Sequence, residues 1–337
     1  MKNPSVAVLG AGNWGTTVAQ LIASNGRDVT LWCRSEAQQK EIAEKRTNEK
    51  YLKGVSLSPR IHSTCNLTQA VRGAALLFFV IPSKAFREVA RTAGDYLEPD
   101  QLIVHGTKGL EAKTHKRMSE ILLEETCVRQ IGVLSGPNIA PEICEGKPAG
   151  TVIASKFPRV IERATEVLLS DRFRVYSNED VTGVELGGAL KNIVALAAGM
   201  AAEMKLGENS KALLVTRGLS EIARLGVALG ARAFTFAGMA GLGDLLVTCS
   251  SPLSRNHQVG VRLARGEKLP EILEKLGMVA EGVNTSKAAH EIAAERGLDL
   301  PLFEGIYRIV HKGLSPAKAL EELMTLSSRH DVDRTLG

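Results

Sequence analysis

The sequence predicts an α/β fold: an N-terminal, doubly wound, mostly parallel sheet followed by an all-α C-terminal domain. Two observations support this. In the first half, short β-branched runs alternate with helical patterns, as in a parallel sheet covered by helices. After about Val181, Ala-, Leu- and Gly-rich helical stretches continue to the C-terminus without a convincing strand. Asn, Glu, Asp and Gly cluster at Asn178–Gly183, so we expect two domains, residues 1–180 and 181–337.

The expected elements follow in chain order. Ser5–Leu9 is the first strand, and the helix Trp14–Asn25 follows it. The remaining strands are expected at Asp28–Cys33, Leu76–Val80, Leu102–His105, Ile131–Ser135, Thr151–Ala154 and Arg174–Ser177. Helices between them include Lys84–Ala93 and Pro158–Leu169, the latter with proline in its first turn. In the second half we expect helices at Val184–Lys205, Leu213–Leu229, Asn256–Arg265, Thr285–Arg296, Pro301–His311 and Pro316–Leu326.

Composition excludes several classes of protein. Aromatic residues are 4% of the chain, too few for base-stacking surfaces, and no Lys/Arg run marks a nucleic-acid or membrane patch. The 5 cysteines are widely spaced and the 7 histidines dispersed, so neither a disulfide framework nor a metal site is expected. The longest apolar run, Ile193–Ala202, is about half of a membrane helix. These features predict a soluble, cytoplasmic protein that binds no nucleic acid and has no membrane span.

A glycine-rich turn joins the first strand to the first helix. Gly10, Gly12 and Gly15 occupy the three positions of G-x-G-x-x-G. The first permits the tight turn, the second lets the backbone approach a pyrophosphate, and the third allows close packing of helix and strand. In this strand–turn–helix context the pattern predicts a Rossmann-type dinucleotide site. The alternative is a purely structural glycine turn.

The end of the second strand indicates which dinucleotide is preferred. An acidic residue there would bind a ribose 2′-hydroxyl, but this chain has Arg34 followed by Ser35. A guanidinium forms charge-assisted hydrogen bonds with a phosphate. The sequence therefore predicts NADP as cofactor, with NADPH preferred and NAD possible, unless Arg34 is only a solvated loop residue.

Three further segments follow strands at the edge of the sheet where ligands bind. They are Ile81-Pro82-Ser83, with Ser83 as the expected N-cap, Gly106-Thr107-Lys108-Gly109, and Ser135-Gly136-Pro137-Asn138. Glycine lets the backbone approach a ligand, and Lys108 adds positive charge. Each segment on its own is also compatible with a simple turn.

The second half carries polar residues where an apolar pattern predominates. Lys191 and Asn192 interrupt a helix whose other faces are apolar. Burial lowers the pKa of a lysine toward the range useful for proton transfer, although a lysine can instead extend its head to solvent. Gly238–Asp244 reads as a glycine-rich loop ending in a carboxylate. A second polar segment begins with Ser254, an expected N-cap, followed by Arg255 and Asn256. This segment is suited to binding a phosphate; the alternative is that it is an ordinary helix-capping sequence.

Taken together, these segments resemble bacterial NAD(P)-dependent glycerol-3-phosphate dehydrogenase over nearly the whole chain. Glu-Leu-x-x-x-x-Lys-Asn, followed by Gly-Leu-Gly-Asp and Ser-Arg-Asn, is the most specific part. The resemblance is carried by Gly10–Gly15, Gly106–Gly109, Ser135–Asn138, Glu185–Asn192, Gly241–Asp244, Ser254–Asn256 and Ala280-Glu281-Gly282.

The resemblance implies an activity and roles for residues. The activity is reversible NAD(P)H-dependent reduction of dihydroxyacetone phosphate to sn-glycerol 3-phosphate, which supplies glycerophospholipid synthesis, by an enzyme that is usually a homodimer. The implied catalytic residues are Lys191, Lys108 and Asp244. The implied cofactor-binding residues are Gly10, Gly12, Asn13, Trp14, Gly15, Arg34, Lys108, Ala140, Arg255, Val279 and Glu281. The implied substrate-binding residues are Lys108, Gly136, Asn138, Lys191, Asp244, Ser254, Arg255 and Asn256.

Two other functions share part of this pattern. A β-hydroxyacid or sugar-acid dehydrogenase has the same two-domain plan and a lysine on a helix, but it recognises a carboxylate. A non-catalytic NADPH sensor would have no need for Lys108, Lys191 and Asp244. One departure from the family is Asn138, where many members carry Ser or Thr; asparagine still offers donor and acceptor atoms.

Overall fold

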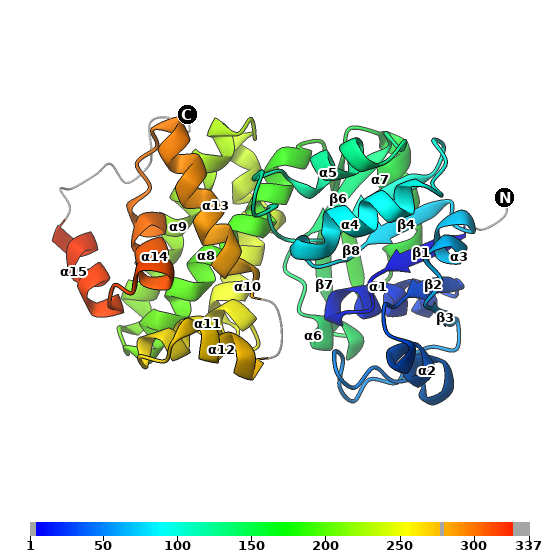
Figure 1. Ribbon diagram of the computed structural model, residues 1–337, viewed down its shortest axis with the longest axis horizontal. Helices are drawn as coiled ribbons and strands as arrows, with labels where there is room; N and C mark the ends of the chain where they lie inside the picture. Colours follow the sequence, from blue (N-terminus) through cyan, green and yellow to red (C-terminus); the bar gives the residue numbers. More distant parts are fainter. Residues whose placement is uncertain (1–4, 277–279, 326–337) are drawn as a thin grey trace. The chain divides into compact units, whose positions relative to one another are not determined.

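The computed structural model describes residues 5–276 and 280–325 (Figure 1). They form two compact units. The first comprises the chain up to Thr107 together with Met118–Val181, and the second comprises Lys108–Arg117 together with the chain from Thr182 onward. The short segment Lys108–Arg117 therefore belongs to the second unit, although it follows a strand of the first.

The first unit is an α/β layer structure with 8 strands in one sheet, which confirms the predicted fold class. Its strands are β1 Val6–Leu9, β2 Val29–Trp32, β3 Ile61–Thr64, β4 Leu76–Phe79, β5 Leu102–His105, β6 Ile131–Ser135, β7 Ala149–Ser155 and β8 Phe173–Asn178. Its helices are α1 Asn13–Ser24, α2 Glu36–Lys45, α3 Leu67–Arg72, α4 Ser83–Gly94, α5 Met118–Glu125, α6 Ala140–Cys144 and α7 Pro158–Leu168.

The strand order is β3-β2-β1-β4-β5-β6-β7-β8, and every pair is parallel except β6 with β7. The order reverses direction between β1 and β4, and such a switch point opens a crevice at the carboxyl ends of the two strands. Val6 pairs with Val29 on one side and with Leu76 on the other. The turn Gly10–Gly15, which follows β1, therefore lies at the position where this fold binds ligands.

Helices cover both faces of this sheet (Figure 1). Successive residues of a strand point to opposite faces, so Val6 and Val8 of β1 join one core while Ala7 and Leu9 join the other. The first core contains side chains from α1, α2, α6 and α7, and the second contains side chains from α3, α4 and α5. The sheet is thus doubly wound, as the sequence predicts.

The second unit is helical, and no strand occurs among its described residues. After α8 Val181–Glu203 come α9 Gly207–Ala228, a 3-10 turn η1 Ala233–Ala237, a π-helical turn η2 Met239–Gly243, α10 Asp244–Ser250, α11 Arg255–Ala264, α12 Leu269–Leu276, α13 Glu281–Arg296, α14 Pro301–Lys312 and α15 Pro316–Thr325.

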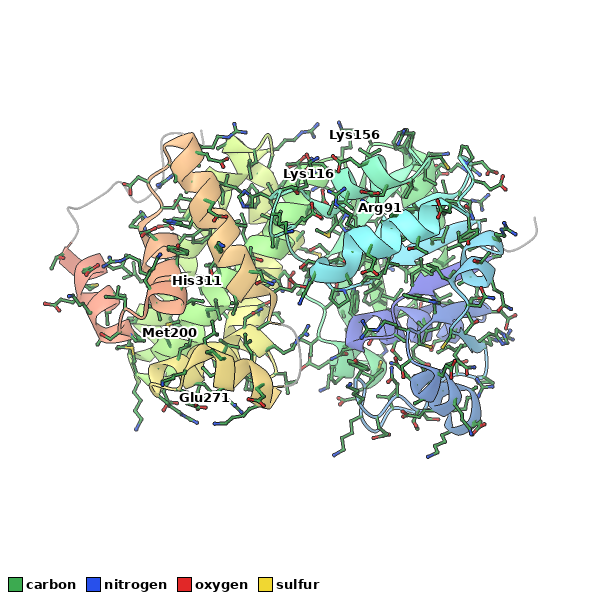
Figure 2. The ribbon with its side chains drawn as sticks, in the orientation of Figure 1. Arg91, Lys116, Lys156, Met200, Glu271 and His311 are labelled. Atoms are coloured by element: carbon green, nitrogen blue, oxygen red, sulfur yellow. The ribbon has the colours of Figure 1, made fainter. Side chains whose placement is uncertain are left out.

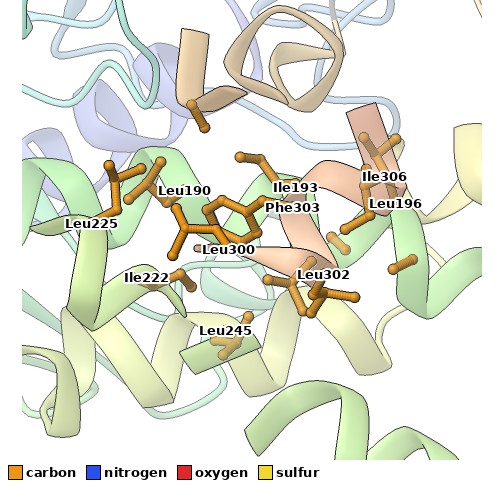
Figure 3. Close-up of a cluster of buried hydrophobic side chains, with 14 of the residues drawn as sticks. Leu190, Ile193, Leu196, Ile222, Leu225, Leu245, Leu300, Leu302, Phe303 and Ile306 are labelled. Atoms are coloured by element: carbon orange, nitrogen blue, oxygen red, sulfur yellow. The ribbon is translucent and has the colours of Figure 1, made fainter. Parts of the chain in front are cut away.

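Helix α8 is the centre of the second unit. By length and composition it could cross a membrane, but 89% of its most apolar window is buried within the protein, as in the core helix of a globular domain. Figure 3 shows Leu190, Ile193 and Leu196 of α8 packed with side chains of α9, α10 and α14. Charged side chains lie on outer helix faces, such as Arg91 on α4 and Glu271 on α12 (Figure 2).

Glycines allow α8 to approach its neighbours very closely. A Cβ atom on Gly199 would lie 2.0 Å from the carbonyl oxygen of His257 in α11, and one on Gly260 would lie 1.9 Å from that of Leu196. Backbone therefore meets backbone where α8 and α11 cross, and a side chain at either position would push the helices apart.

Several elements escaped prediction. Strand β3 reads Ile-His-Ser-Thr and has no apolar run, because it lies at the sheet edge with only Ile61 buried. Helix α2 buries only Ile42, so its apolar periodicity is too weak to detect. Helix α4 starts at Ser83 with Pro82 as N-cap, so the expectation that Ser83 is the N-cap was wrong.

Candidate functional site

The glycine turn has a separate structural reason for each glycine. Gly10 has φ +111°, and a Cβ there would lie 2.3 Å from the carbonyl oxygen of Val80. A Cβ on Gly15 would lie 1.8 Å from the carbonyl oxygen of Gly10. Gly12 differs, because nothing lies within 4 Å of where its Cβ would be. The first and third glycines thus serve packing, while the second leaves open space next to the backbone, as close approach of a ligand requires.

Two polar atoms beside this turn have no partner. Asn13 Oδ1 and Trp14 Nε1 are buried and make no hydrogen bond to any described part of the chain. Such groups are costly unless something pairs with them. The first N–H groups of α1 are also free of intrahelical partners, and they lie at the positive end of the helix dipole. The open space and these N–H donors together fit the pyrophosphate of a dinucleotide, whose oxygens only accept hydrogen bonds.

The residues after β2 include Arg34, which the predicted preference for NADPH requires to be accessible to a phosphate. Arg34 is exposed and forms no hydrogen bond or ion pair within residues 5–276 and 280–325. Ser35 is the N-cap of α2, where its hydroxyl oxygen accepts a hydrogen bond from the backbone N–H of Gln38 (3.5 Å). The guanidinium of Arg34 is therefore available to an external anion beside a helix N-terminus.

Other expected ligand contacts in the first unit prove to have structural partners. Gly106 accommodates the indole of Trp14, whose Nε1 would lie 2.9 Å from a Cβ at this position. Gly136 has φ +143°, which explains the glycine. The side-chain amide of Asn138 donates to the carbonyl oxygen of Gly150 (2.9 Å) and accepts from the hydroxyl of Thr151 (3.0 Å). Asn138 therefore connects the loop after β6 to strand β7.

In the second unit, all three expected catalytic side chains meet. Lys191 lies on α8, Asp244 is the first residue of α10, and Lys108 lies in the segment after β5. Asp244 Oδ1 accepts a hydrogen bond from Lys191 Nζ and Asp244 Oδ2 accepts one from Lys108 Nζ, both at 2.6 Å. A single carboxylate thus holds two ammonium groups, one on each oxygen.

Burial sets the electrostatics of this cluster. The side chains of Lys191 and Asp244 are 8% and 2% exposed, while that of Lys108 is 21% exposed. Burial lowers the pKa of Lys191 to about 8, the Asp244 carboxylate opposes this, and the positive charge of Lys108 adds to the lowering. The prediction that Lys191 is buried is confirmed. Its pKa is suited to proton transfer near neutral pH.

Thr248, which sequence reasoning missed, completes the cluster. Its hydroxyl accepts a hydrogen bond from Lys191 Nζ (2.6 Å) and donates one to the backbone carbonyl of Asp244 (2.6 Å). An ammonium has three N–H donors, so one donor of Lys191 remains beyond these two partners within the described chain. The four-residue spacing of Asp244 and Thr248, one helical turn, was the available signal.

The segment before Asp244 is not the loop that was expected. Met239–Gly243 forms a π-helical turn that runs directly into α10. A Cβ on Gly241 would lie 2.1 Å from the carbonyl oxygen of Phe236, and a Cβ on Gly187 of α8 would lie 2.6 Å from that of Ala240. These glycines therefore bring the start of α10 against α8, which places Asp244 beside Lys191.

Ser254, Arg255 and Asn256 form the start of α11. Ser254 is the N-cap, accepting a hydrogen bond from the backbone N–H of His257 (3.3 Å), as predicted. Arg255 is exposed. The side chain is only partly covered, yet desolvation by neighbouring parts of the chain lowers the pKa of the guanidinium, and the Glu281 carboxylate raises it; arginine stays charged at neutral pH.

Asn256 links three helices rather than standing free. Its side-chain amide donates to Asn192 Oδ1 on α8 (2.9 Å), and its Oδ1 accepts from the backbone N–H of Gly282 in α13 (3.0 Å). This explains the polar Asn192 within an otherwise apolar helix. Of the remaining expected cofactor residues, Val279 lies outside the described residues, Ala140 is the buried first residue of α6 and Glu281 is the first residue of α13.

The chain is similar to known proteins over almost its whole length. Residues 5–160 match the family model described as the N-terminus of NAD-dependent glycerol-3-phosphate dehydrogenase, and residues 180–321 match the model of its C-terminus. Similar curated proteins named glycerol-3-phosphate dehydrogenase (NAD(P)+) occur in Exiguobacterium sp., at 45% identity over 98% of both chains, and in Geobacillus kaustophilus, at 46% identity over 98% of this chain and 96% of the relative.

A solved structure agrees. The crystal structure of glycerol-3-phosphate dehydrogenase from Coxiella burnetii has a TM-score of 0.92 and 35% identity, and the match covers 96% of this chain and 99% of that one. The predicted resemblance is therefore confirmed. The chain belongs to the NAD-dependent glycerol-3-phosphate dehydrogenase family.

Proposed function

We propose that this chain catalyses the reversible NAD(P)H-dependent reduction of dihydroxyacetone phosphate to sn-glycerol 3-phosphate, which supplies glycerophospholipid synthesis. The observation that carries this assignment is the buried cluster in which Asp244 holds Lys191 and Lys108 at 2.6 Å each. Family membership adds support, because relatives that match nearly the whole chain are named for this activity.

Lys191 is the proton donor of the reduction and the proton acceptor of the reverse reaction. When bound, the nicotinamide cofactor would supply the hydride to the substrate carbon, or accept it in the reverse reaction. Negative charge then develops on the former carbonyl oxygen, where the remaining N–H of Lys191 stabilises it and delivers a proton. With a pKa of about 8, Lys191 exchanges this proton readily near neutral pH.

Asp244 and Lys108 prepare the site for this charge. Asp244 keeps Lys191 protonated against the cost of burial, and its second oxygen anchors Lys108. Two ammonium groups against one carboxylate leave a net positive charge, which favours an anionic substrate and a developing alkoxide. A purely non-catalytic NADPH sensor has no use for this arrangement.

The substrate phosphate is assigned to the start of α11. Arg255 offers a charged fork, and the first-turn N–H groups lie at the positive end of the helix dipole. Ser254 and Asn256 shape this end through the hydrogen bonds described above. Gly136 and Asn138 are proposed as further substrate contacts from the family resemblance alone. Holding a remote phosphate uses its binding energy to position the carbonyl.

The cofactor is assigned to the glycine turn Gly10–Gly15, with Arg34 on the 2′-phosphate of NADPH. The guanidinium is exposed and has no partner in the described part of the chain, which supports a preference for NADPH over NADH. The further cofactor contacts proposed from the family resemblance are Lys108, Ala140, Arg255, Val279 and Glu281. The relatives' names include both NAD and NADP, which accords with NAD as the weaker cofactor.

Three further proposals concern the whole protein. We retain residues 1–180 as the dinucleotide-binding domain and residues 181–337 as the substrate-binding and catalytic domain. A homodimer and a cytoplasmic location are proposed from the family resemblance. Light scattering at several protein concentrations tests the first of these two, since a monomer at all concentrations contradicts it.

One experiment separates the proposed activity from its alternatives. NADPH absorbance is followed after addition of dihydroxyacetone phosphate, and then after addition of a panel of 2- and 3-oxo acids. We expect oxidation with dihydroxyacetone phosphate alone. Oxidation with an oxo acid instead would indicate a hydroxyacid dehydrogenase, and NADPH binding without oxidation by any substrate would indicate a sensor.

A further inference from the structure

A buried side-chain amide lies directly beneath the glycine turn. Asn48, in the connection between α2 and β3, has no exposed surface. Its side chain spans the turn from one end to the other: Nδ2 donates to the carbonyl oxygen of Ala11 (3.0 Å) and to the hydroxyl of Thr16 in α1 (2.8 Å). No motif of the dinucleotide fold predicted a role for this residue.

A second amide reinforces the first. The side chain of Gln38, in the first turn of α2, donates from Nε2 to the same carbonyl of Ala11 (2.6 Å) and to Asn48 Oδ1 (3.2 Å). The Ala11 carbonyl is acceptor-only, so both amides must turn their NH₂ groups toward it. With this orientation, Asn48 Oδ1 is free to accept the second hydrogen bond from Gln38 Nε2. The three groups form a closed set with one consistent orientation.

This set fixes the direction of a peptide group within the glycine turn. The bond between Ala11 and Gly12 is trans and planar, so its carbonyl and its N–H point in opposite directions. Two hydrogen bonds hold the carbonyl toward the protein interior. The N–H of Gly12 is therefore turned outward, beside the open space at Gly12 and the free N–H groups at the start of α1.

We propose that Asn48 is a positioning residue for the dinucleotide: together with Gln38 it holds the Ala11–Gly12 peptide in the orientation that binds the pyrophosphate. The inference rests on the cofactor site proposed above. It adds a residue distant in sequence from the glycine motif whose loss weakens cofactor binding before any chemistry takes place.

Gln38 connects this function to cofactor choice. Its backbone N–H donates a hydrogen bond to the hydroxyl of Ser35, which is next to Arg34. Its side chain donates to the carbonyl oxygen of Ala11. The same residue thus ties the pyrophosphate turn to the segment assigned to the 2′-phosphate. One residue therefore holds both proposed phosphate-binding segments, one through its backbone and the other through its side chain.

The test measures cofactor binding directly. The 2 tryptophans, Trp14 and Trp32, both belong to the first unit, so quenching of their fluorescence by added NADPH reports binding without turnover. Asn48→Leu is close in size and removes every donor. Leaving the Ala11 carbonyl with Gln38 as its one side-chain partner, and Gln38 without the Asn48 oxygen that holds it, should raise the Kd for NADPH about tenfold, which corresponds to about 1.4 kcal/mol.

A matched control separates positioning from general stability. Gln101 is another buried amide of the same unit, with its side chain donating to the backbone carbonyls of Val71 (2.9 Å) and Ala74. We expect Gln101→Met to lower the thermal unfolding temperature, as Asn48→Leu does, while its Kd for NADPH stays at the wild-type value. In steady state, Asn48→Leu should raise the KM for NADPH and leave the KM for dihydroxyacetone phosphate unchanged.

The remaining outcomes are also decisive. A wild-type Kd in folded Asn48→Leu, or equal weakening in Gln101→Met, overturns the inference. If Asn48→Leu does not fold, Gln38→Met decides, because it removes one of the two donors; a Kd raised about threefold supports the inference and an unchanged Kd refutes it. Wild-type protein that binds neither NADPH nor NADH would refute the proposed cofactor site itself.

Discussion

Replacing Asp244 with asparagine keeps the shape of the side chain and removes its negative charge. In the wild-type protein this carboxylate is 2% exposed and accepts a hydrogen bond from each of two ammonium groups. In Asp244→Asn, an NH₂ group replaces one of the two oxygens, so one of the two lysines faces a donor and loses its acceptor. Lys191 and Lys108 then repel each other without an intervening anion.

The magnitude follows from the burial of the pair. Removing one partner of a buried ion pair costs about 3–5 kcal/mol, and each 1.36 kcal/mol lost by the charged form lowers a pKa by about one unit. Since the Asp244 carboxylate raises the pKa of Lys191 toward its value of about 8, we expect this pKa to fall by at least about one unit in the variant. Part of the cost is expected to appear as lower stability.

The assay is the pH dependence of kcat/KM for dihydroxyacetone phosphate at saturating NADPH, which reports groups of the enzyme before this substrate binds. Reduction needs protonated Lys191, so the wild-type rate should fall as the pH rises through about 8. In Asp244→Asn this descending limb should move to lower pH. Thr248→Val is the matched control, because it removes a hydrogen bond from Lys191 but no charge. A limb that stays in place or moves to higher pH in Asp244→Asn would refute the assignment.

Other perturbations test other parts of the account. Arg34→Gln should raise the KM for NADPH about tenfold and leave that for NADH nearly unchanged, since only NADPH carries the 2′-phosphate; equal effects on both would contradict its role. Burial raises the pKa of Glu221 to about 7, against two backbone hydrogen bonds that lower it. Its contribution to stability is therefore present below its unfolded pKa and lost as the pH rises through about 7. The free energy of unfolding of Glu221→Gln, measured by urea titration at a series of pH values, should lack this decline. If it changes with pH in parallel with that of the wild-type protein, Glu221 is not the cause of the decline. Gly199→Ala places a Cβ 2.0 Å from the carbonyl oxygen of His257 and should destabilise the fold by about 2 kcal/mol or more; unchanged thermal unfolding would show that α8 and α11 separate freely.

The sequence predicted those parts of the molecule that have a local signal. The glycine turn, the strands buried on both faces and the apolar helix α8 all follow from periodicity and from glycine spacing. The burial of Lys191 was also predictable, because its neighbours along the helix are apolar. These features depend on residues close together in the chain.

Features that depend on distant residues were not predictable. The network of Asn48 joins it to Ala11, 37 positions away, and no spacing rule connects the two. Arg117 pairs with buried Glu185 at 2.6 Å across 68 positions. The π-helical turn before Asp244 looked like a loop, because its glycines serve close helix packing rather than flexibility.

The central claim is that Lys191 transfers the proton in the reduction of dihydroxyacetone phosphate. The most direct test compares wild-type protein and Lys191→Met by two measurements on the same samples: kcat for that substrate and the Kd for NADPH from fluorescence quenching. Loss of the proton donor should lower kcat by about 10²–10⁴-fold, with the Kd for NADPH unchanged. A kcat near that of the wild-type protein would contradict the claim.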